Sequence, residues 1–314
     1  MEILKNPHFD FLGKARYFIL ASLLLIAAGV AFIATREIRY GVEFSGGTQL
    51  IIKFQNAPQV DRIRLAVDPV APGSVIQSYG EASSNRVLIR VGSTGEGEEL
   101  DAPARRVLAA LGGSYGENPV VESNSEIVGP VVGAELRRKA IQLTVLGLLF
   151  QLIYIGFRFK GAVWGAGATV AVLHDVLVTL TLLAFFKYEI TLNVIAALLT
   201  LVGYSVNDTI VIFDRARENL RHKRKEPLRK ILNDSLNQTL SRTLISNGTT
   251  FLAVLGLYLF GGEVLRGFGF TMVIGILVGT YSTIYIASPI VAWWTGRKGR
   301  PAAAPTKTAA RAAL

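Results

Sequence analysis

Cysteine is absent from this 314-residue chain, so the sequence can form no disulfide and offers neither a thiolate nucleophile nor a cysteine ligand for a metal. Histidine is scarce as well: His8, His174 and His222 are the only three, and they lie far apart in the sequence. Structural and catalytic metal sites depend mostly on clustered histidine, cysteine and carboxylate ligands. We therefore expect no metal centre and no bound cofactor.

A catalytic constellation is also missing, because nothing in the sequence pairs a nucleophile with a general base. The segment GVEFSGGT, residues 41–48, resembles a phosphate-binding loop but lacks its Lys-Ser or Lys-Thr ending. The Gly46-Gly47 pair instead favours a turn that opens a strand. The net charge of +10 would suit nucleic acid, but the basic residues cluster beside apolar segments, where membrane orientation explains them better. We expect neither an enzyme nor a nucleic-acid-binding protein.

Long apolar runs dominate the composition, since 51% of the residues are hydrophobic. The first run is longer than the apolar part of a signal peptide and is not followed by a small-residue cleavage site, so we interpret it as an uncleaved span. A run of about 20 apolar residues suffices to cross a bilayer. The sequence predicts six spans, at residues 17–35, 140–157, 161–186, 190–213, 243–260 and 264–294.

Basic residues follow the second, fourth and sixth spans, whereas the loops on the opposite side hold few charges. The positive-inside rule then predicts that residues 1–16, the basic loop 214–242 and the tail 295–314 are cytoplasmic. Residues 36–139 are predicted to lie outside, and residues 140–294 to form the five-helix remainder of the bundle. The tail is rich in Ala, Pro and Thr, has nothing to bury and is expected to be disordered.

The basic run RHKRKEPLRK, residues 221–230, is most simply a signal for orientation, but it could also attract anionic lipid or a ribosome-like partner. After this run, leucine and isoleucine recur at helical spacing over residues 228–244. This pattern predicts an amphipathic helix that runs along the membrane interface into the fifth span.

Residues 36–139 are polar overall and alternate between strand and helix patterns. Strands are expected at 48–54, 74–79, 86–91 and 120–127, and helices at 59–68 and 102–111. This order, βαββαβ, is that of the ferredoxin-like split βαβ arrangement. The fold class predicted for the chain is a polytopic α-helical membrane protein with six transmembrane helices and one α+β ferredoxin-like extracytoplasmic domain.

An aspartate stands inside the fourth apolar run, and this is the most informative residue in the sequence. Asp208 lies about two turns, roughly 10 Å, before Arg215, which places it at membrane depth. Carboxylates there are rare and are functional-site candidates by default. Asn207 and Asp214 are seven residues apart and share one helix face, so we expect a polar seam turned away from lipid. A purely structural seam is the alternative.

Three further polar residues complete the candidate site. His174 and Asp175 fall near the middle of the third span, and Arg242 stands at the inner mouth of the fifth. Because arginine keeps its proton, Arg242 could act as counter-ion and gate for Asp208 as helices move. A proton that crosses the membrane yields about 2.3 kcal/mol per 100 mV. The residues therefore suggest an ion-coupled machine, although His174 and Asp175 could equally be an interhelical hydrogen-bonded pair.

Several motifs together resemble one family. They are GVEFSGGT from Gly41, HDV from His174, VNDTIVIFDRARENLR from Val206, NQTLSRTL from Asn237 and VGTYSTIYIASPIV from Val278. With the layout of the whole chain, they resemble the SecF family of protein-export membrane proteins, within the resistance-nodulation-division type of transporter.

The resemblance implies an accessory subunit of the bacterial Sec translocase in the plasma (inner) membrane. With its partner SecD, such a subunit uses the proton-motive force to help an exported preprotein leave the SecYEG channel. It implies that Asp208 is the proton-relay aspartate and Arg242 the functional arginine, with protons as the coupling ion. A further essential aspartate of the family lies in SecD, so this chain alone would be an incomplete pump.

The sequence departs from the family at Glu43, where aspartate is usual, and at Asn247, where serine is common. Asn247 lies one turn beyond Arg242 and would alter the local hydrogen bonds. Two alternatives to the translocase subunit stay open at this point. One is a subunit of a proton-coupled small-molecule exporter, and the other is an assembly factor that conducts no ions.

Overall fold

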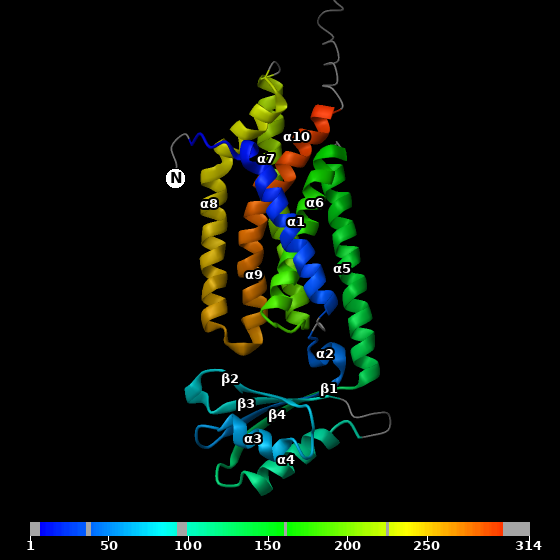
Figure 1. Ribbon diagram of the computed structural model, residues 1–314, viewed down its shortest axis with the longest axis vertical. Helices are drawn as coiled ribbons and strands as arrows, with labels where there is room; N and C mark the ends of the chain where they lie inside the picture. The colour runs from blue at the N-terminus through cyan, green and yellow to red at the C-terminus, as the bar shows by residue number, and fades with distance from the viewer. Residues whose placement is uncertain (1–6, 36–38, 93–98, 160–161, 224–225, 298–314) are drawn as a thin grey trace, which may run out of the picture.

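The computed structural model describes residues 7–35, 39–92, 99–159, 162–223 and 226–297. A bundle of long helices stands on a small sheet, and α3 and α4 lie on the sheet's far side (Figure 1). Helix α1 begins, and α10 ends, at the end of the bundle opposite the sheet. The expected disorder of the tail concerns residues outside the described ranges, except for its first positions.

Six helices in the described part of the chain are long and apolar enough to cross a membrane, which confirms the predicted number of spans. Five are continuous: α1 (Phe11–Thr35), α5 (Pro130–Phe159), α6 (Ala162–Phe185), α7 (Leu192–His222) and α8 (Leu228–Phe260). The sixth consists of α9 (Gly262–Ser282), the π-helical turn η2 (Thr283–Ala287) and α10 (Ser288–Arg297). The chain is thus a multi-pass membrane protein.

The helices extend beyond the predicted spans. Helix α7 has 31 residues, which is roughly 46 Å, whereas the hydrocarbon core of a bilayer is about 30 Å thick. Most of the segment predicted as the basic loop 214–242 is therefore helical, as the end of α7 and the beginning of α8. Its apolar residues do form a helix face, but this face packs into the core of the bundle through Ile231, Leu232 and Leu236 rather than along an interface.

The centre of the bundle consists of α6, α7 and the α9–α10 unit, in which half or more of the most apolar stretch is buried. By contrast, α1, α5 and α8 bury little and expose large apolar side chains such as Leu24, Phe150 and Leu252. Side chains of this kind suit contact with lipid or with another membrane protein. The two buried aspartates, Asp175 and Asp208, belong to the central helices, and further buried polar residues such as Asn247 lie on α8.

The domain between α1 and α5 has the predicted βαββαβ order. It contains α2 (Val42–Ser45), β1 (Gly47–Phe54), α3 (Val60–Val67), β2 (Val75–Tyr79), η1 (Ala82–Ser84), β3 (Arg86–Val91), α4 (Ala102–Ser114) and β4 (Val120–Val128). The four strands form one antiparallel sheet in the order β2-β3-β1-β4. The predicted strands and helices all exist, with bounds shifted by a few residues.

Alternation along the strands places one face of the sheet in a core. Leu50, Ile52 and Phe54 of β1 are almost completely buried with residues of α3 and α4. The predicted turn before β1 is also present, because Gly46 and Gly47 have positive φ angles of 71° and 133°. The opposite face of the sheet turns toward the helix bundle (Figure 1).

The domain is joined to the bundle at the short loop between α6 and α7. The backbone N–H of Gly41 donates to the carbonyl oxygen of Ile190 at 2.9 Å, and the N–H of Ile190 donates to the carbonyl oxygen of Arg39 at 2.8 Å. Arg90 of β3 also forms an ion pair with Glu189 in this loop, and both side chains are mostly buried. The sheet's free face is thereby held against the end of the bundle that lies nearest to it.

Candidate functional site

Asp208 lies on the buried face of α7 and is 6% exposed. Its Oδ2 accepts a hydrogen bond from Nδ2 of Asn247 on α8. The same Nδ2 donates to Oγ1 of Thr280 on α9 at 2.6 Å, and the hydroxyl of Tyr204 donates to Oδ1 of Asn247 at 3.0 Å. The amide of Asn247 therefore joins three helices around the carboxylate of Asp208.

A second buried carboxylate, that of Asp175, lies on the neighbouring helix α6. Asp175 on α6 is 1% exposed, and its Oδ2 accepts hydrogen bonds from two hydroxyls. Ser205 of α7 donates at 2.5 Å and Ser282 of α9 at 2.9 Å. The interhelical hydrogen bonds expected as the alternative role of this residue are thus present, with serines as partners.

His174 precedes Asp175 and completes this second cluster. Its Nδ1 lies 3.0 Å from Oδ1 of Asp175, and its ring stacks on Tyr281 with centroids 5.9 Å apart. The hydroxyl of Tyr281 in turn contacts Ser22 of α1 at 2.8 Å. The Nε2 of His174 is buried and has no hydrogen-bond partner among the described residues. The cluster therefore reaches from α6 to α1.

Helices α7 and α9 link the two carboxylates. Each of these helices contributes to both clusters. Tyr204 of α7 and Thr280 of α9 bond to Asn247 beside Asp208, whereas Ser205 of α7 and Ser282 of α9 bond to Asp175. The link needs a close helix approach, which Gly279 permits: a Cβ there would lie 3.2 Å from the Cβ of Ser205 and 3.6 Å from Oδ2 of Asp175. Directly after Ser282 the helix widens into η2, and such π-turns occur frequently at functional sites.

The other predicted site residues lie outside these clusters. Asn207 is exposed on the outside of the bundle, because successive helix residues differ by about 100° around the axis. Asp214 shares that side of α7 and forms an ion pair with Arg158 at 2.5 Å near the end of the bundle. Asn207 and Asp214 therefore do not line the interior of this bundle. The buried clusters use the neighbouring face of α7, which carries Ser205 and Asp208.

Arg242 is exposed on α8, and among the described residues it forms no ion pair with Asp208. The direct contact of the two residues therefore remains a prediction about another conformation. In the conformation described here, Asn247 occupies the position of partner.

Sequence reasoning missed the hydroxyl partners, Ser205, Thr280 and Ser282. A signal for them was present, because each is a small polar residue inside an apolar span and Ser205 precedes Asp208 by one helical turn. Serine and threonine are, however, tolerated in transmembrane helices when they bond to their own backbone, as Thr280 also does with Ile276 at 2.8 Å. The residue type and its position in the sequence do not show whether a hydroxyl bonds to its own helix backbone or to a side chain on another helix.

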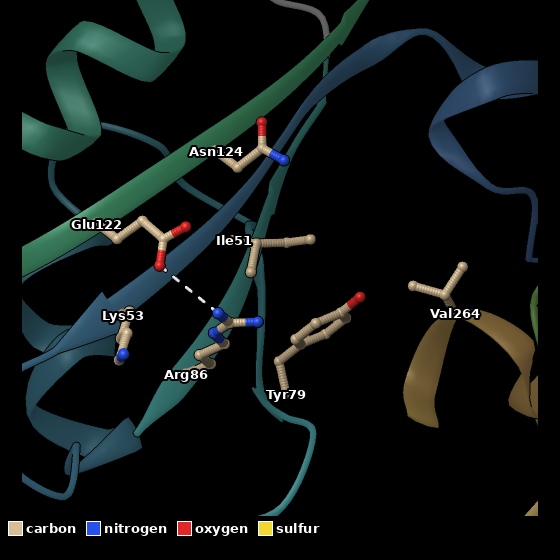
Figure 2. A pocket seen from close by; sticks show the side chains of 7 residues that line it. All are labelled: Ile51, Lys53, Tyr79, Arg86, Glu122, Asn124 and Val264. Atoms are coloured by element: carbon tan, nitrogen blue, oxygen red, sulfur yellow. Dashed lines mark hydrogen bonds and ion pairs between the residues drawn. The ribbon is translucent and has the colours of Figure 1, made fainter. Parts of the chain in front are cut away.

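A cleft of about 300 Å³ lies between the free face of the sheet and the beginning of α9. Figure 2 shows Tyr79 of β2 pointing toward Val264 across this gap, beside Ile51. The polar wall includes Arg86 and Glu122, whose side chains form an ion pair at 3.5 Å. The cleft therefore combines an apolar side with charged groups outside the bundle.

In the described ranges, no three histidine, aspartate or glutamate side chains gather in a way that could hold a metal ion. Within the described bundle, the buried polar groups are instead two carboxylates, one histidine, three asparagine amides and several hydroxyls. Groups of this kind bind and pass protons or hold helices together.

Comparison with known proteins gives a consistent result. The family described as "Protein export membrane protein SecD/SecF, C-terminal" matches residues 111–297, and the "SecD/SecF GG Motif" matches residues 31–58. A relative from Gemmatimonas aurantiaca, named protein translocase subunit SecF, is 39% identical over 99% of this chain and 95% of its own length. A second, from Calditerrivibrio nitroreducens with the same name, is 42% identical over 93% and 96%.

Solved structures agree with these relatives. The crystal structure of SecDF from Thermus thermophilus, titled a translocon-associated membrane protein, is 35% identical, covers 93% of this chain and has a TM-score of 0.80. SecDF in a form titled super-membrane-facing is 37% identical, covers 94% and has a TM-score of 0.70. This chain spans only 39% and 40% of those two longer chains.

Proposed function

Because this chain belongs to the SecD/SecF family of protein-export membrane proteins, we propose that it is an accessory subunit of the Sec translocase whose bundle uses the proton-motive force to promote late export. Protons are the coupling ion, and Asp208 is the residue that takes up and releases them. The proposed setting is a bacterial plasma membrane, with both termini in the cytoplasm and the sheet domain outside.

The observation that supports this role most strongly is the partner of Asp208. A fixed salt bridge would hold a buried carboxylate in its charged form. Asn247 is neutral and has both a donor and an acceptor, so it can donate to a carboxylate or, after rotation, accept from a carboxylic acid. The hydroxyls of Tyr204 and Thr280, which bond to the same amide, can also act in either sense. The network suits a group that changes its charge.

In the proposed cycle, Arg242 stabilises the deprotonated, negatively charged form of Asp208. It precedes Asn247 by five residues on α8, which is about 7.5 Å along the helix axis. Because five residues also turn by about 140° around the axis, α8 must rotate as well as shift against α7 to bring the guanidinium to the deprotonated Asp208. One proton yields about 2.3 kcal/mol per 100 mV. That suffices to bias two conformations that differ by a few kcal/mol.

The proposed partners are SecD, the SecYEG channel and the exported preprotein. The solved SecDF chains extend well beyond the part that this chain matches, which leaves room for a second half. In this chain, α1, α5 and α8 expose large apolar side chains, and Asn207 is a polar residue exposed close to Asp208 on α7. A second membrane protein seated there would cover both features. The cleft beside Tyr79 offers a surface outside the membrane for an emerging polypeptide.

The test is export of a secretory protein by inner-membrane vesicles that contain this chain and its SecD partner, with and without a protonophore. We expect Asp208→Asn to abolish the proton-dependent part of export while the complex still assembles. Asp234→Asn is the matched control, because Asp234 pairs with Lys223 at the end of the bundle. Export by Asp208→Asn that responds fully to the protonophore would reject the proposed role and favour an assembly factor that conducts no ions.

A further inference from the structure

A second cavity, of about 410 Å³, opens at the end of the bundle where α1 begins and α10 ends. Its walls come from α1, α8 and the last helical segment. Leu12 and Arg16 belong to α1, Arg229 to α8, and Ala292 and Trp293 to α10. Arg16 directly precedes the apolar stretch of α1, so the cavity lies at the level where the apolar bundle surface gives way to charge.

Both arginines in this cavity lack a carboxylate partner among the described residues. Arg229 donates one hydrogen bond, from Nη2 to the carbonyl oxygen of Leu12 at 3.1 Å. Arg16 donates to the hydroxyl of Tyr17 at 2.6 Å and lies over its ring at 4.7 Å. Several N–H donors of both guanidinium groups are therefore still available.

Acidic residues at this end of the bundle pair with other cations. Lys223 and Lys230, at the same end of the bundle, pair with Asp234 and Glu226 respectively. Asp10 directly precedes α1, and its Oδ1 accepts a hydrogen bond from the backbone N–H of Gly13 at 2.8 Å and so caps the helix. Asp10 thus reduces the local positive charge without forming an ion pair with either arginine.

The shape and chemistry of the cavity fit one class of ligand. Two guanidinium groups match a phosphate, to which arginine binds through paired N–H donors. The apolar wall, with Leu12, Pro289 and Ala292, suits a hydrocarbon chain. Trp293 is 59% exposed, and tryptophan is enriched at the headgroup level of membranes. Basic pockets between helices at this level bind anionic lipid headgroups.

We propose that this cavity, between Arg16 of α1 and Arg229 of α8, binds the headgroup phosphate of an anionic phospholipid, with an acyl chain against Trp293. The lipid would bridge α1, which buries little of its own surface in the bundle, to α8 and α10. The lipid site does not depend on proton coupling; only its assignment to the cytoplasmic leaflet rests on the proposed orientation. The sequence left open that the basic run, residues 221–230, attracts anionic lipid; this proposal assigns that role to Arg229 of the run, together with Arg16.

The test uses the tryptophan in the cavity as a probe. The full chain, with Trp164 and Trp294 replaced by phenylalanine, is reconstituted with dibrominated phosphatidylglycerol or dibrominated phosphatidylcholine, whose bromines quench tryptophan on contact. A basic residue near an anionic surface contributes about 1 kcal/mol, which is about fivefold in association constant. Two arginines therefore predict a preference for phosphatidylglycerol of about 25-fold at low ionic strength, where screening is weak.

Matched variants separate the cavity from general surface charge. We expect Arg16→Gln with Arg229→Gln to reduce the preference to less than about threefold. Lys14→Gln with Arg221→Gln removes two exposed cations outside the cavity and should leave the preference within about twofold of the parent. Far-ultraviolet circular dichroism of both double variants checks that their helices are intact.

Three outcomes would overturn the proposal. Equal quenching by the two lipids in the parent would show that the cavity does not select a headgroup. An undiminished preference in the double arginine variant, or the same loss in the control variant, would place the selectivity elsewhere. Inorganic phosphate that removes the preference at a concentration no higher than that of the lipid would identify the ligand as free phosphate, because a headgroup that is also held through its acyl chain should resist such competition.

Discussion

Asn247 offers the most quantitative test of the site, because one side chain joins three helices. Asn247→Leu keeps a similar volume but removes its hydrogen bonds to Asp208, Thr280 and Tyr204. Interhelical hydrogen bonds in membranes contribute about 0.6 kcal/mol on average, with a maximum near 1.7. Three of them predict a loss of about 2 kcal/mol in the free energy of unfolding. Reversible unfolding in mixed micelles measures this loss.

A double-mutant cycle isolates the bond to the carboxylate. Hydrogen bonds to charged groups contribute about 1.5–3 kcal/mol in net terms. We therefore expect Asp208→Asn and Asn247→Leu to couple by about 1–2 kcal/mol. The control cycle pairs Asp208→Asn with Asn193→Leu, roughly 22 Å away along α7, and should be additive within about 0.5 kcal/mol. Additivity in the Asp208–Asn247 cycle would refute the network from which the function is argued.

Three further predictions concern packing and docking. Gly279→Val forces α9 away from α7 and should cost about 1–3 kcal/mol, measured by thermal unfolding in detergent; an unchanged unfolding temperature would contradict the close contact. Phe54→Ala removes a side chain that is 1% exposed and should cost the outer domain about 3–5 kcal/mol of unfolding free energy; a loss below about 1 kcal/mol would place it outside the core. Arg90→Gln breaks the ion pair with Glu189 and should speed amide hydrogen exchange in the loop between α6 and α7, whereas Arg86→Gln should not; equal exchange in both would mean that the ion pair does not hold the sheet.

The outer domain was predictable because its pattern is local. Alternating residues such as Leu50 and Ile52, bounded by turn residues, define a strand and its buried face without knowledge of any partner. Its attachment to the bundle was not predictable, because Arg90 and Glu189 are far apart in sequence and only the folded chain brings them together. The cleft beside Val264 follows from the same long-range arrangement.

Within the bundle, the sequence showed which polar residues are unusual but not which residues they contact. Asp208 and Asp175 stood out because carboxylates in apolar runs are unusual, and both are buried. That Asn207 faces outward from the bundle of this chain was not foreseen, because a seven-residue spacing shows that two residues share a face but not which neighbour that face meets. In the basic segment 214–242, the helix predicted from residue 228 onward is present, but the continuation of α7 to His222 was not predicted, because charge density carries no information on how far a helix continues into water.

Proton movement is the central claim, and it can be measured without an exported substrate. The chain and its SecD partner are reconstituted in vesicles that contain a pH-sensitive dye, and a potassium diffusion potential drives proton entry. We predict proton flux in the wild type and in Asp234→Asn, and flux no greater than that of empty vesicles in Asp208→Asn. Proton flux at the wild-type rate in Asp208→Asn would contradict the account, because protons would then cross without this carboxylate.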